Sequence, residues 1–307
     1  MRLPGTVRIA IKIDVDTRIG TRRGIPRLLA IFRRAKVRAS FFAVFGPDNS
    51  GKAVFRVFRR RGFVGKMVRT NPLKIYGLRT LLYGTVLPAP LTGLAFPDVI
   101  RSVEAEGHEL GLHSYDHVLW QDHVGEWDKG RAAIELERGL AAHSQVVGHR
   151  PRGVAAPGWQ ATALSLKAQD ELGLTYASDT RGRHPFFPVI AGERFSTLQI
   201  PGTLPTVDEI LGLPGITDSN AIDHLETLLD PDRLNVYTGH AEIEGMCLSE
   251  AFESFIGRLA RRGVTFTTLE EVASSDAPEG RRASFCEMLQ GTVPGRAGLV
   301  ACQGSPA

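Results

Sequence analysis

Short apolar runs alternate with helix-like segments along most of this chain, and this alternation constrains the fold more than any other feature. The apolar runs predict strands over residues 7–13, 40–44, 108–112, 153–156, 175–178, 234–238 and 264–267, with one more around Ile200. Helical patterns over 26–35, 97–106, 128–142 and 249–262 separate many of them. Strands that alternate with helices form parallel βα units. The sequence therefore predicts an α/β fold.

The chain is predicted to form one large domain. Its 307 residues, 43% hydrophobic and 23% charged, have the composition of a globular protein and exclude a disordered, collagenous or coiled-coil chain. We expect a domain over 1–275 that includes an insertion at 50–97. Residues 276–307 are rich in Gly, Pro, Ser and Arg, and we expect a loop-like tail there without a core of its own.

Two acids, Asp14 and Asp16, come directly after the first predicted strand. Because side chains alternate along a strand, both carboxylates lie on one face at the carboxyl end. Two acids so close repel one another unless a cation compensates them. A divalent ion or an arginine would do so, whereas an exposed acidic turn needs no partner.

Two histidines, His113 and His117, follow another predicted strand, at a spacing that would bring both imidazoles onto one face of a helix. Catalytic metal sites of the zinc type use three protein ligands and leave one position open. Asp16, His113 and His117 are therefore predicted to hold one divalent metal ion. This donor set suits zinc, manganese, cobalt or iron about equally, and solvated loop histidines are the alternative.

A third histidine, His240, ends the strand predicted at 234–238 and would reach the same rim. An imidazole there can act as general acid, because its pKa lies near neutrality. Asp179, which follows another strand, is the expected carboxylate partner of His240. A packed loop histidine is the alternative.

The segment Gly46–Lys52 matches the G-x-x-x-x-G-K pattern of a phosphate-binding loop. The next residue is Ala53, which lacks the hydroxyl that would hold magnesium, and Asp48 would place a negative charge in the phosphate cradle. We therefore expect no nucleotide. Asp48 and Asn49 are predicted to lie near a substrate instead.

Nine basic residues and no acid lie between positions 52 and 79, and aromatic and aliphatic side chains are interleaved with them. This pattern is typical of a segment at an anionic membrane interface, although an amphipathic hairpin packed on the domain with its cations in water is the alternative. Nucleic acid is not expected, because stacking platforms are few and no nucleic-acid fold signature is present. The predicted membrane or lipid contacts are Arg56, Arg59, Arg60, Phe63, Lys66 and Arg69.

The cysteines and the N-terminus favour a cytoplasmic protein. Cys247, Cys286 and Cys302 are odd in number and widely spaced, which fits neither a disulfide framework nor a cysteine zinc site. The N-terminus has no export signal, and the uncharged run at 80–96 is too short and too broken by Gly and Pro to span a membrane.

The order of these motifs resembles the metal-dependent polysaccharide deacetylases of the NodB-homology type, over roughly residues 7–270. This resemblance implies a distorted β/α barrel, in which Asp14 is the general base, Asp16, His113 and His117 hold the metal, and His240 is the acid. It further implies that Arg152, or alternatively Arg150, pairs with Asp14. Trp159, and Tyr115 between the two metal histidines, are then expected substrate contacts.

Seven sequence blocks, among them IDVDTRIGTRRGIPRLL, LHSYDHVLWQDHVGEWD and VYTGHAEIEG, resemble one branch of this family. Its members remove the formyl group from undecaprenyl-phosphate-linked 4-deoxy-4-formamido-L-arabinose, in the modification of lipid A with aminoarabinose that gives polymyxin resistance. The resemblance thus implies a hydrolase of a linear amide that lies peripherally on the inner face of the cytoplasmic membrane. A deacetylase of another amino sugar or glycan, or a non-catalytic lipid-carrier-binding protein, is the alternative.

Overall fold

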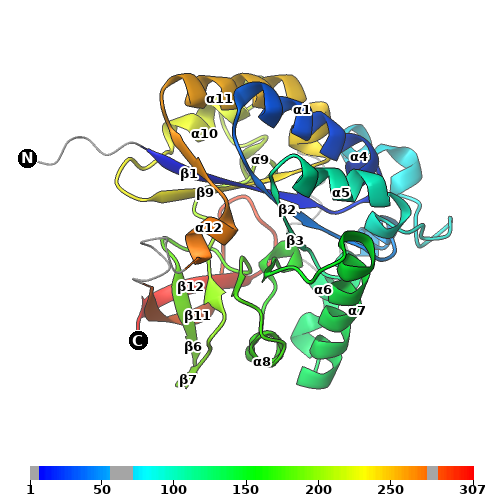
Figure 1. The fold of residues 1–307 in the computed structure, drawn as a ribbon, viewed down its shortest axis with the longest axis vertical. Coiled ribbons are helices and arrows are strands. Elements are labelled where there is room, and N and C mark those ends of the chain that lie inside the picture. The colour runs from blue at the N-terminus through cyan, green and yellow to red at the C-terminus, as the bar shows by residue number, and fades with distance from the viewer. Residues whose placement is uncertain (1–6, 56–71, 275–282) are drawn as a thin grey trace, which may run out of the picture.

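The computed structural model describes residues 7–55, 72–274 and 283–307, and its twelve described strands join in one sheet (Figure 1). Strand β1 (Arg8–Val15) is central to this sheet. It pairs in parallel with β9 (Leu234–His240) along one edge. Along the other edge it pairs with β10 (Thr265–Thr267) at its start and with β2 (Ser40–Ala43) at its end.

The parallel strands curve into a distorted barrel. Beyond β2 the order continues through β3 (Glu109–Leu112), β4 (Gly153–Val154), β5 (Tyr176–Ala177) and β8 (Leu198–Gln199). The chain after β8 then returns to β9, where the backbone N–H groups of Thr203 and Leu204 both donate to Val236 O, at 3.1 and 3.2 Å. These bonds close the ring, and the predicted α/β fold with a distorted barrel is confirmed.

The alternation of side chains along β1 separates the outer core from the barrel interior. Ile9, Ile11 and Ile13 pack outward into the large cluster that contains the helices, whereas Ala10 belongs to the small cluster inside the barrel. The inward positions that follow Ala10 are Lys12 and Asp14. The period of two therefore directs charged side chains into the barrel at the carboxyl end of β1.

Helices α1 (Ile25–Ala35), α5 (Pro97–Ala105), α10 (Ala221–Thr227) and α11 (Ser249–Arg261) lie together along one side of the sheet, at the top of Figure 1. Apolar residues at helical spacing explain this position, because Leu28, Phe32, Phe252 and Phe255 are fully buried in the outer core. The remaining α-helices of the described residues are α4 (Pro72–Thr80), α6 (His117–His123), α7 (Lys129–Val147), α8 (Ala163–Glu171), α9 (Val207–Ile210) and α12 (Leu269–Ala273).

The expectation of a loop-like tail at 276–307 is wrong for its described residues, 283–307. Strands β11 (Ser284–Gly291) and β12 (Val300–Pro306) form an antiparallel pair, and β11 adds in parallel to β6 (Phe186–Ile190). Cys286, Met288 and Ala301 are buried in a cluster with Phe186. Strand β6 also pairs with β7 (Glu193–Arg194), another hairpin that the sequence pattern did not indicate.

The described part of the insertion packs beside the barrel rim. Helix α4 is interrupted at Gly77, and Pro47 forms a bridge with Leu91. The predicted lipid contacts Arg56, Arg59, Arg60, Phe63, Lys66 and Arg69 lie outside the described residues. Among the helices of the described ranges, none is both long and apolar enough to cross a membrane.

Candidate active site

Asp16, His113 and His117 come together at the carboxyl end of β1, as predicted. His113 Nε2 lies 3.3 Å from Asp16 Oδ1, and His117 Nε2 lies 3.5 Å from Asp16 Oδ2. One ligand atom from each of the three residues falls within 4.8 Å of the other two. This spacing suits a single divalent cation bound by one carboxylate and two imidazoles.

The chemistry of these donors also fits a cation. Asp16 Oδ1 is buried and has no hydrogen-bond partner among the described residues. Although burial alone would raise the pKa of Asp16, the charge of His117 and the proximity of His113 lower that pKa below its usual value. Asp16 is therefore a carboxylate with a free oxygen, which is the form that binds a metal.

The two histidines lie on either side of a turn that connects the end of a strand to the start of a helix. His113 follows β3, Ser114 has a left-handed φ of 65°, and His117 is the first residue of α6. The Asp116 side chain accepts a hydrogen bond from Leu119 N at 3.0 Å and thereby caps this helix. The expectation that both imidazoles share one helical face is wrong, because α6 begins only at His117.

The ring of His113 is oriented by a backbone carbonyl. Its Nδ1 lies 2.7 Å from Ala155 O, so this nitrogen carries the proton and donates it. The lone pair of Nε2 is then directed toward Asp16. Hydrogen bonding of one ring nitrogen to leave the other as ligand is the usual arrangement of a metal-binding histidine.

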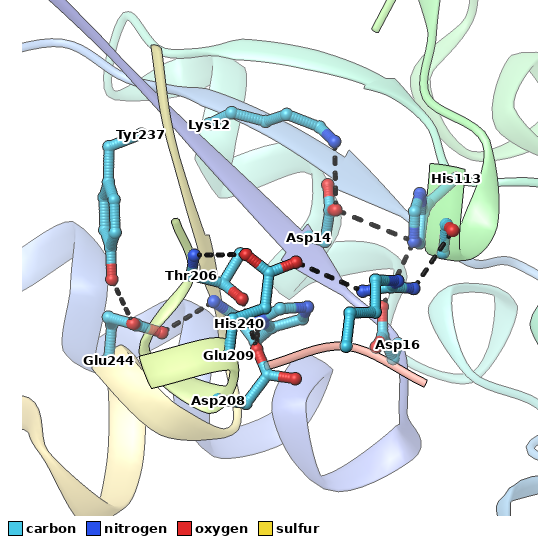
Figure 2. Close-up of polar contacts among 12 residues, drawn as sticks. Lys12, Asp14, Asp16, His113, Thr206, Asp208, Glu209, Tyr237, His240 and Glu244 are labelled. Carbon is cyan, nitrogen blue, oxygen red and sulfur yellow. Dashed lines mark hydrogen bonds and ion pairs between the residues drawn. The ribbon is translucent and has the colours of Figure 1, made fainter. Parts of the chain in front are cut away.

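Asp14 is paired with Lys12, not with an arginine (Figure 2). Lys12 Nζ donates to Asp14 Oδ2 at 3.0 Å, and the lysine is fully buried inside the barrel with its ammonium over the rings of Phe42 and Trp159. The other carboxylate oxygen, Asp14 Oδ1, is buried without a hydrogen-bond partner among the described residues. Asp14 thus keeps one oxygen that can accept a proton.

The prediction that Arg152 or Arg150 pairs with Asp14 is wrong. Both arginines precede β4, and the amino end of a parallel strand lies at the opposite end of the barrel from the carboxyl end of β1. Arg152 forms an exposed ion pair with Glu270 instead, at 3.1 Å. Its predicted contact with substrate fails for the same reason.

His240 is paired with Asp208, a residue that the sequence analysis did not select. Asp208 Oδ1 lies 4.0 Å from His240 Nδ1 (Figure 2). Burial alone would lower the pKa of His240, but the negative charges of Asp208, Asp16, Asp14 and Glu244 raise it to about 8. His240 is therefore protonated at neutral pH.

The backbone of His240 is fixed by Glu244. The His240 N–H donates to Glu244 Oε2 at 2.6 Å, and the Tyr237 hydroxyl donates to Oε1 of the same carboxylate. Glu244 is fully buried. It satisfies two donors at the end of β9 and so holds the imidazole at the rim.

The prediction that Asp179 is the partner of His240 is wrong. Asp179 is fully buried and accepts hydrogen bonds from Ala156 N at 2.7 Å and from Gln169 Nε2 at 2.6 Å. Burial raises its pKa, although these hydrogen bonds and the charge of Lys12 oppose the rise. Its contacts fix the loop after β4, so its role is structural.

Asp48 and Asn49 have partners within the protein. Asp48 accepts hydrogen bonds from Arg18 N and Ser50 N, at 2.9 and 3.2 Å, and Asn49 Nδ2 donates to Asp116 Oδ2 at 2.6 Å. Both residues are buried. They hold the turn after β2 against the histidine loop, and their contact with substrate stays a prediction.

Tyr115 and Trp159 lie next to the site in different ways. Tyr115 is half-buried under the guanidinium of Arg138, whose Cζ lies 4.2 Å from the ring centroid. Trp159 is buried, and its ring contacts the guanidinium groups of Arg181 and Arg296 at 4.8 and 4.6 Å. Substrate contact by either aromatic side chain stays a prediction.

A buried acid, Glu242, lies behind the metal ligands. Its Oε1 accepts hydrogen bonds from the backbone and the hydroxyl of Thr17, at 2.9 and 2.6 Å. Burial and the charge of Asp16 raise the pKa of Glu242 to about 8, so it is protonated at neutral pH. Glu242 therefore adds no full negative charge beside Asp16 at neutral pH.

Sequence reasoning missed Lys12, Asp208 and Glu244. Lys12 carried a usable signal, because it lies two residues before Asp14 on a buried strand and must share its face. Asp208 carried no such signal, since its contact depends on where the barrel brings α9. Glu244 lies only four residues after His240, but no motif marked its contact.

Comparison with known proteins assigns the class to which this fold and site belong. Residues 8–177 match the family described as polysaccharide deacetylase, and the chain belongs to that family. In solved structures the fold is similar to a protein from Pseudomonas aeruginosa PAO1 described as a probable polysaccharide deacetylase, with a TM-score of 0.61 and 17% identity over 88% of this chain and 90% of that one. A structure from Mycobacterium smegmatis described as a putative polysaccharide deacetylase gives a TM-score of 0.64 at 20% identity, over 95% and 97% of the two chains.

Within the family, two relatives share a particular name. The chain is 34% identical to the probable 4-deoxy-4-formamido-L-arabinose-phosphoundecaprenol deformylase ArnD of Shewanella sediminis, over 99% of this chain and 97% of the relative. It is 32% identical to the protein of the same name from Wigglesworthia glossinidia brevipalpis, over 93% and 98% of the two chains.

Proposed function

We propose that this protein is a metal-dependent amide hydrolase that removes the formyl group from undecaprenyl-phosphate-linked 4-deoxy-4-formamido-L-arabinose, a step in the modification of lipid A with aminoarabinose. The observation that carries the reaction class is the juxtaposition of a three-residue cation site, a buried carboxylate with a free oxygen and a protonated histidine. The substrate is inferred from the two relatives named as deformylases.

The cation site would supply a Lewis acid. A divalent ion held by Asp16, His113 and His117 would polarise the amide carbonyl and lower the pKa of a water at the site. The protein prepares the ligands for this role: Ala155 O fixes the ring of His113, and the capped start of α6 places His117. The metal is one divalent ion, proposed to be zinc, manganese or cobalt.

Asp14 is proposed as the general base. Lys12 holds Oδ2, and the partner-free Oδ1 accepts the proton of the attacking water. The buried lysine keeps the carboxylate in one orientation and compensates its charge inside the barrel. Asp16 is two residues further along and binds the cation, so the two acids have different partners and different roles.

His240 is proposed as the general acid. Its Nδ1 faces Asp208, so the opposite ring nitrogen, Nε2, is the one that delivers a proton to the departing sugar nitrogen. A pKa of about 8 keeps the imidazole protonated at pH 7. Formate and the free amine are the products.

The proposed function is tested by mass spectrometry with the purified protein and the formylated lipid-linked sugar. We expect loss of the formyl group by the wild type, abolition by a chelator, and recovery on adding divalent metal. Asp14→Asn should lose turnover by about 100-fold or more while it keeps its metal. Asp98→Asn, a substitution of the same kind at a side chain that is 93% exposed, is the control.

Three results would count against the proposal. Formate release that persists in chelator would contradict a metal-dependent reaction. Near wild-type turnover by Asp14→Asn would remove Asp14 as the base. Activity on acetylated sugars but not on the formylated one would identify a deacetylase instead, and metal binding without any hydrolysis would indicate a carrier-binding protein.

We further propose that the protein acts at the cytoplasmic membrane, on its inner face. Large apolar side chains in the described part of the insertion are exposed, namely Leu73, Leu78, Val86 and Leu91. The nine cations at 52–79 lie in the same stretch of sequence. Exposed apolar groups beside cations are the features by which a peripheral protein binds anionic lipid.

Flotation with anionic liposomes tests this location. We expect the wild type to float with the vesicles at low salt, and a variant with the cations of 52–79 reversed to stay at the bottom of the gradient. Neutral liposomes are the control. Equal flotation of the two proteins on anionic vesicles would leave the insertion without its proposed role.

A further inference from the structure

The connection between β11 and β12, residues 292–299, reaches two segments of the active site. Its Arg296 donates through Nη2 to Gly158 O at 3.0 Å, and Nη1 lies 3.6 Å from Glu209 Oε1. The same guanidinium lies over the ring of Trp159, with Cζ 4.6 Å from the centroid. One side chain thus joins the loop after β4 to helix α9.

The backbone of residues 292–299, like the side chain of Arg296, packs closely against the segments around the active site. Gly295 has a φ of 77°, and a Cβ built there would lie 1.8 Å from Glu209 O, so only glycine permits this approach. On the other side, Gln160 Nε2 donates to Leu299 O at 2.7 Å. Gln290 Nε2, at the end of β11, donates to Ala161 O at 3.0 Å.

Both segments that Arg296 joins lie next to a partner of a reacting group. On one side, the Trp159 ring also faces the ammonium of Lys12, which holds Asp14. On the other side, Glu209 is the neighbour of Asp208, which faces His240. A shift of either segment therefore moves a partner of the base or a partner of the acid.

Arg296 is suited to fix these segments because its surroundings are buried. Its side chain is 9% exposed, and that of Glu209 is fully buried. Arg181 already holds Glu209 in a two-pronged contact, with Nη1 2.8 and 2.9 Å from the two carboxylate oxygens, and approaches Trp159 from its own strand end. Arg296 adds the link to Gly158 O and a side-chain tie to the C-terminal hairpin, which the backbone of Arg181 already meets at Ala301 O and Gln303 N.

We propose that Arg296 is a positioning residue for the reacting groups, and that the C-terminal hairpin is thereby part of the active site. Arg296 acts through Trp159 on the Lys12–Asp14 pair and through Glu209 on Asp208. The kinetic part of this inference rests on the proposed function.

The test is Arg296→Gln in the full chain, with Arg194→Gln as the matched control. Arg194 also lies over an aromatic ring, that of Phe285 at 4.6 Å, but it is exposed on β7, and among the described residues it has no recorded contact with the loop after β4 or with helix α9. A third variant, Arg296→Lys, keeps the charge and loses the planar fork. We measure kcat, KM, metal content and backbone hydrogen exchange for each.

For Arg296→Gln we expect kcat to fall about 10- to 100-fold with metal content unchanged, because small displacements of catalytic groups have effects of this size. Exchange should become faster at the amides of Trp159 and Leu211, which are bonded to Ala156 O and Val207 O in the two joined segments. Arg296→Lys should recover only part of kcat. Arg194→Gln should behave as wild type in all four measurements.

Several results would overturn the inference. Wild-type exchange at both amides would show that Arg296 does not hold these segments. Faster exchange with unchanged kcat would show that holding them does not matter for turnover, and a fall in kcat in proportion to lost metal or lost folded protein would indicate a general structural role. If the wild type itself fails to deformylate the substrate, the proposed function fails, and the exchange data alone decide whether Arg296 positions the two segments.

Discussion

Replacing Lys12 by methionine removes the cation of the buried pair and keeps the side chain's length. Lys12 Nζ lies 3.0 Å from Asp14 Oδ2, and both side chains are buried. At an effective dielectric of about 20, two charges this close attract by about 5 kcal/mol. Breaking a buried pair on one side costs about 3–5 kcal/mol, because the remaining charge is left unpaired. We expect Lys12→Met to lower the free energy of unfolding by about that amount.

The pair energy is measured by urea unfolding of the wild type, Lys12→Met, Asp14→Asn and the double variant, all in chelator so that metal binding does not contribute. Since the double variant leaves no unpaired charge, it should be more stable than Lys12→Met, with a coupling of about 3 kcal/mol. The matched control is the cycle on Lys167 and Glu193, which lie 3.1 Å apart but are 47% and 52% exposed. Its coupling should stay below about 1 kcal/mol.

Additive effects at Lys12 and Asp14 would refute the reasoning. A coupling no larger than that of the Lys167 control would show that the buried lysine does not compensate Asp14. The orientation proposed for the catalytic base would then have no energetic support.

Two further predictions concern pH. Asp208→Asn removes the charge that contributes most to the raised pKa of His240. The alkaline limb of the kcat profile, expected near pH 8 in the wild type, should therefore move to lower pH by about one unit or more. An unchanged limb would show that Asp208 does not set the pKa of the general acid. At Glu109, burial raises the pKa to about 7, against the hydrogen bond from Ser40 and despite an ordinary value of 4.5. The unfolded state therefore loses this proton first as the pH rises, and the wild type should lose about 2.5 kcal/mol of stability relative to Glu109→Gln between pH 5 and pH 8. Parallel stability curves for the two proteins, followed by chemical denaturation, would contradict a protonated Glu109 in the fold.

Local patterns predicted much of the barrel. The apolar runs at 7–13, 40–44 and 234–238 became β1, β2 and β9 with boundaries moved by a few residues. These strands are buried on both faces, so apolar residues predominate in them and they stand out from the surrounding sequence. Strands β11 and β12 were missed because only a few of their side chains are buried and Gly, Ser and Arg surround them.

The metal ligands were predictable for a related reason. Asp16, His113 and His117 each follow the end of a parallel strand or begin the next helix, and the carboxyl ends of parallel strands meet at one rim. The same rule also explains the error at Arg152, which precedes its strand and so lies at the other end. The direction of the strand decided both outcomes.

By itself, the sequence determined which side chains reach the rim, because alternation along a strand and the parallel direction of βα units are local properties. Only the tertiary structure decided how groups from distant segments are paired: His240 with Asp208, and Trp159 with an arginine from the C-terminal hairpin. Each of these two pairs joins segments more than thirty residues apart. Closure of the barrel and burial of the charges inside it determine which distant segments contact one another. A local sequence pattern predicts neither of these.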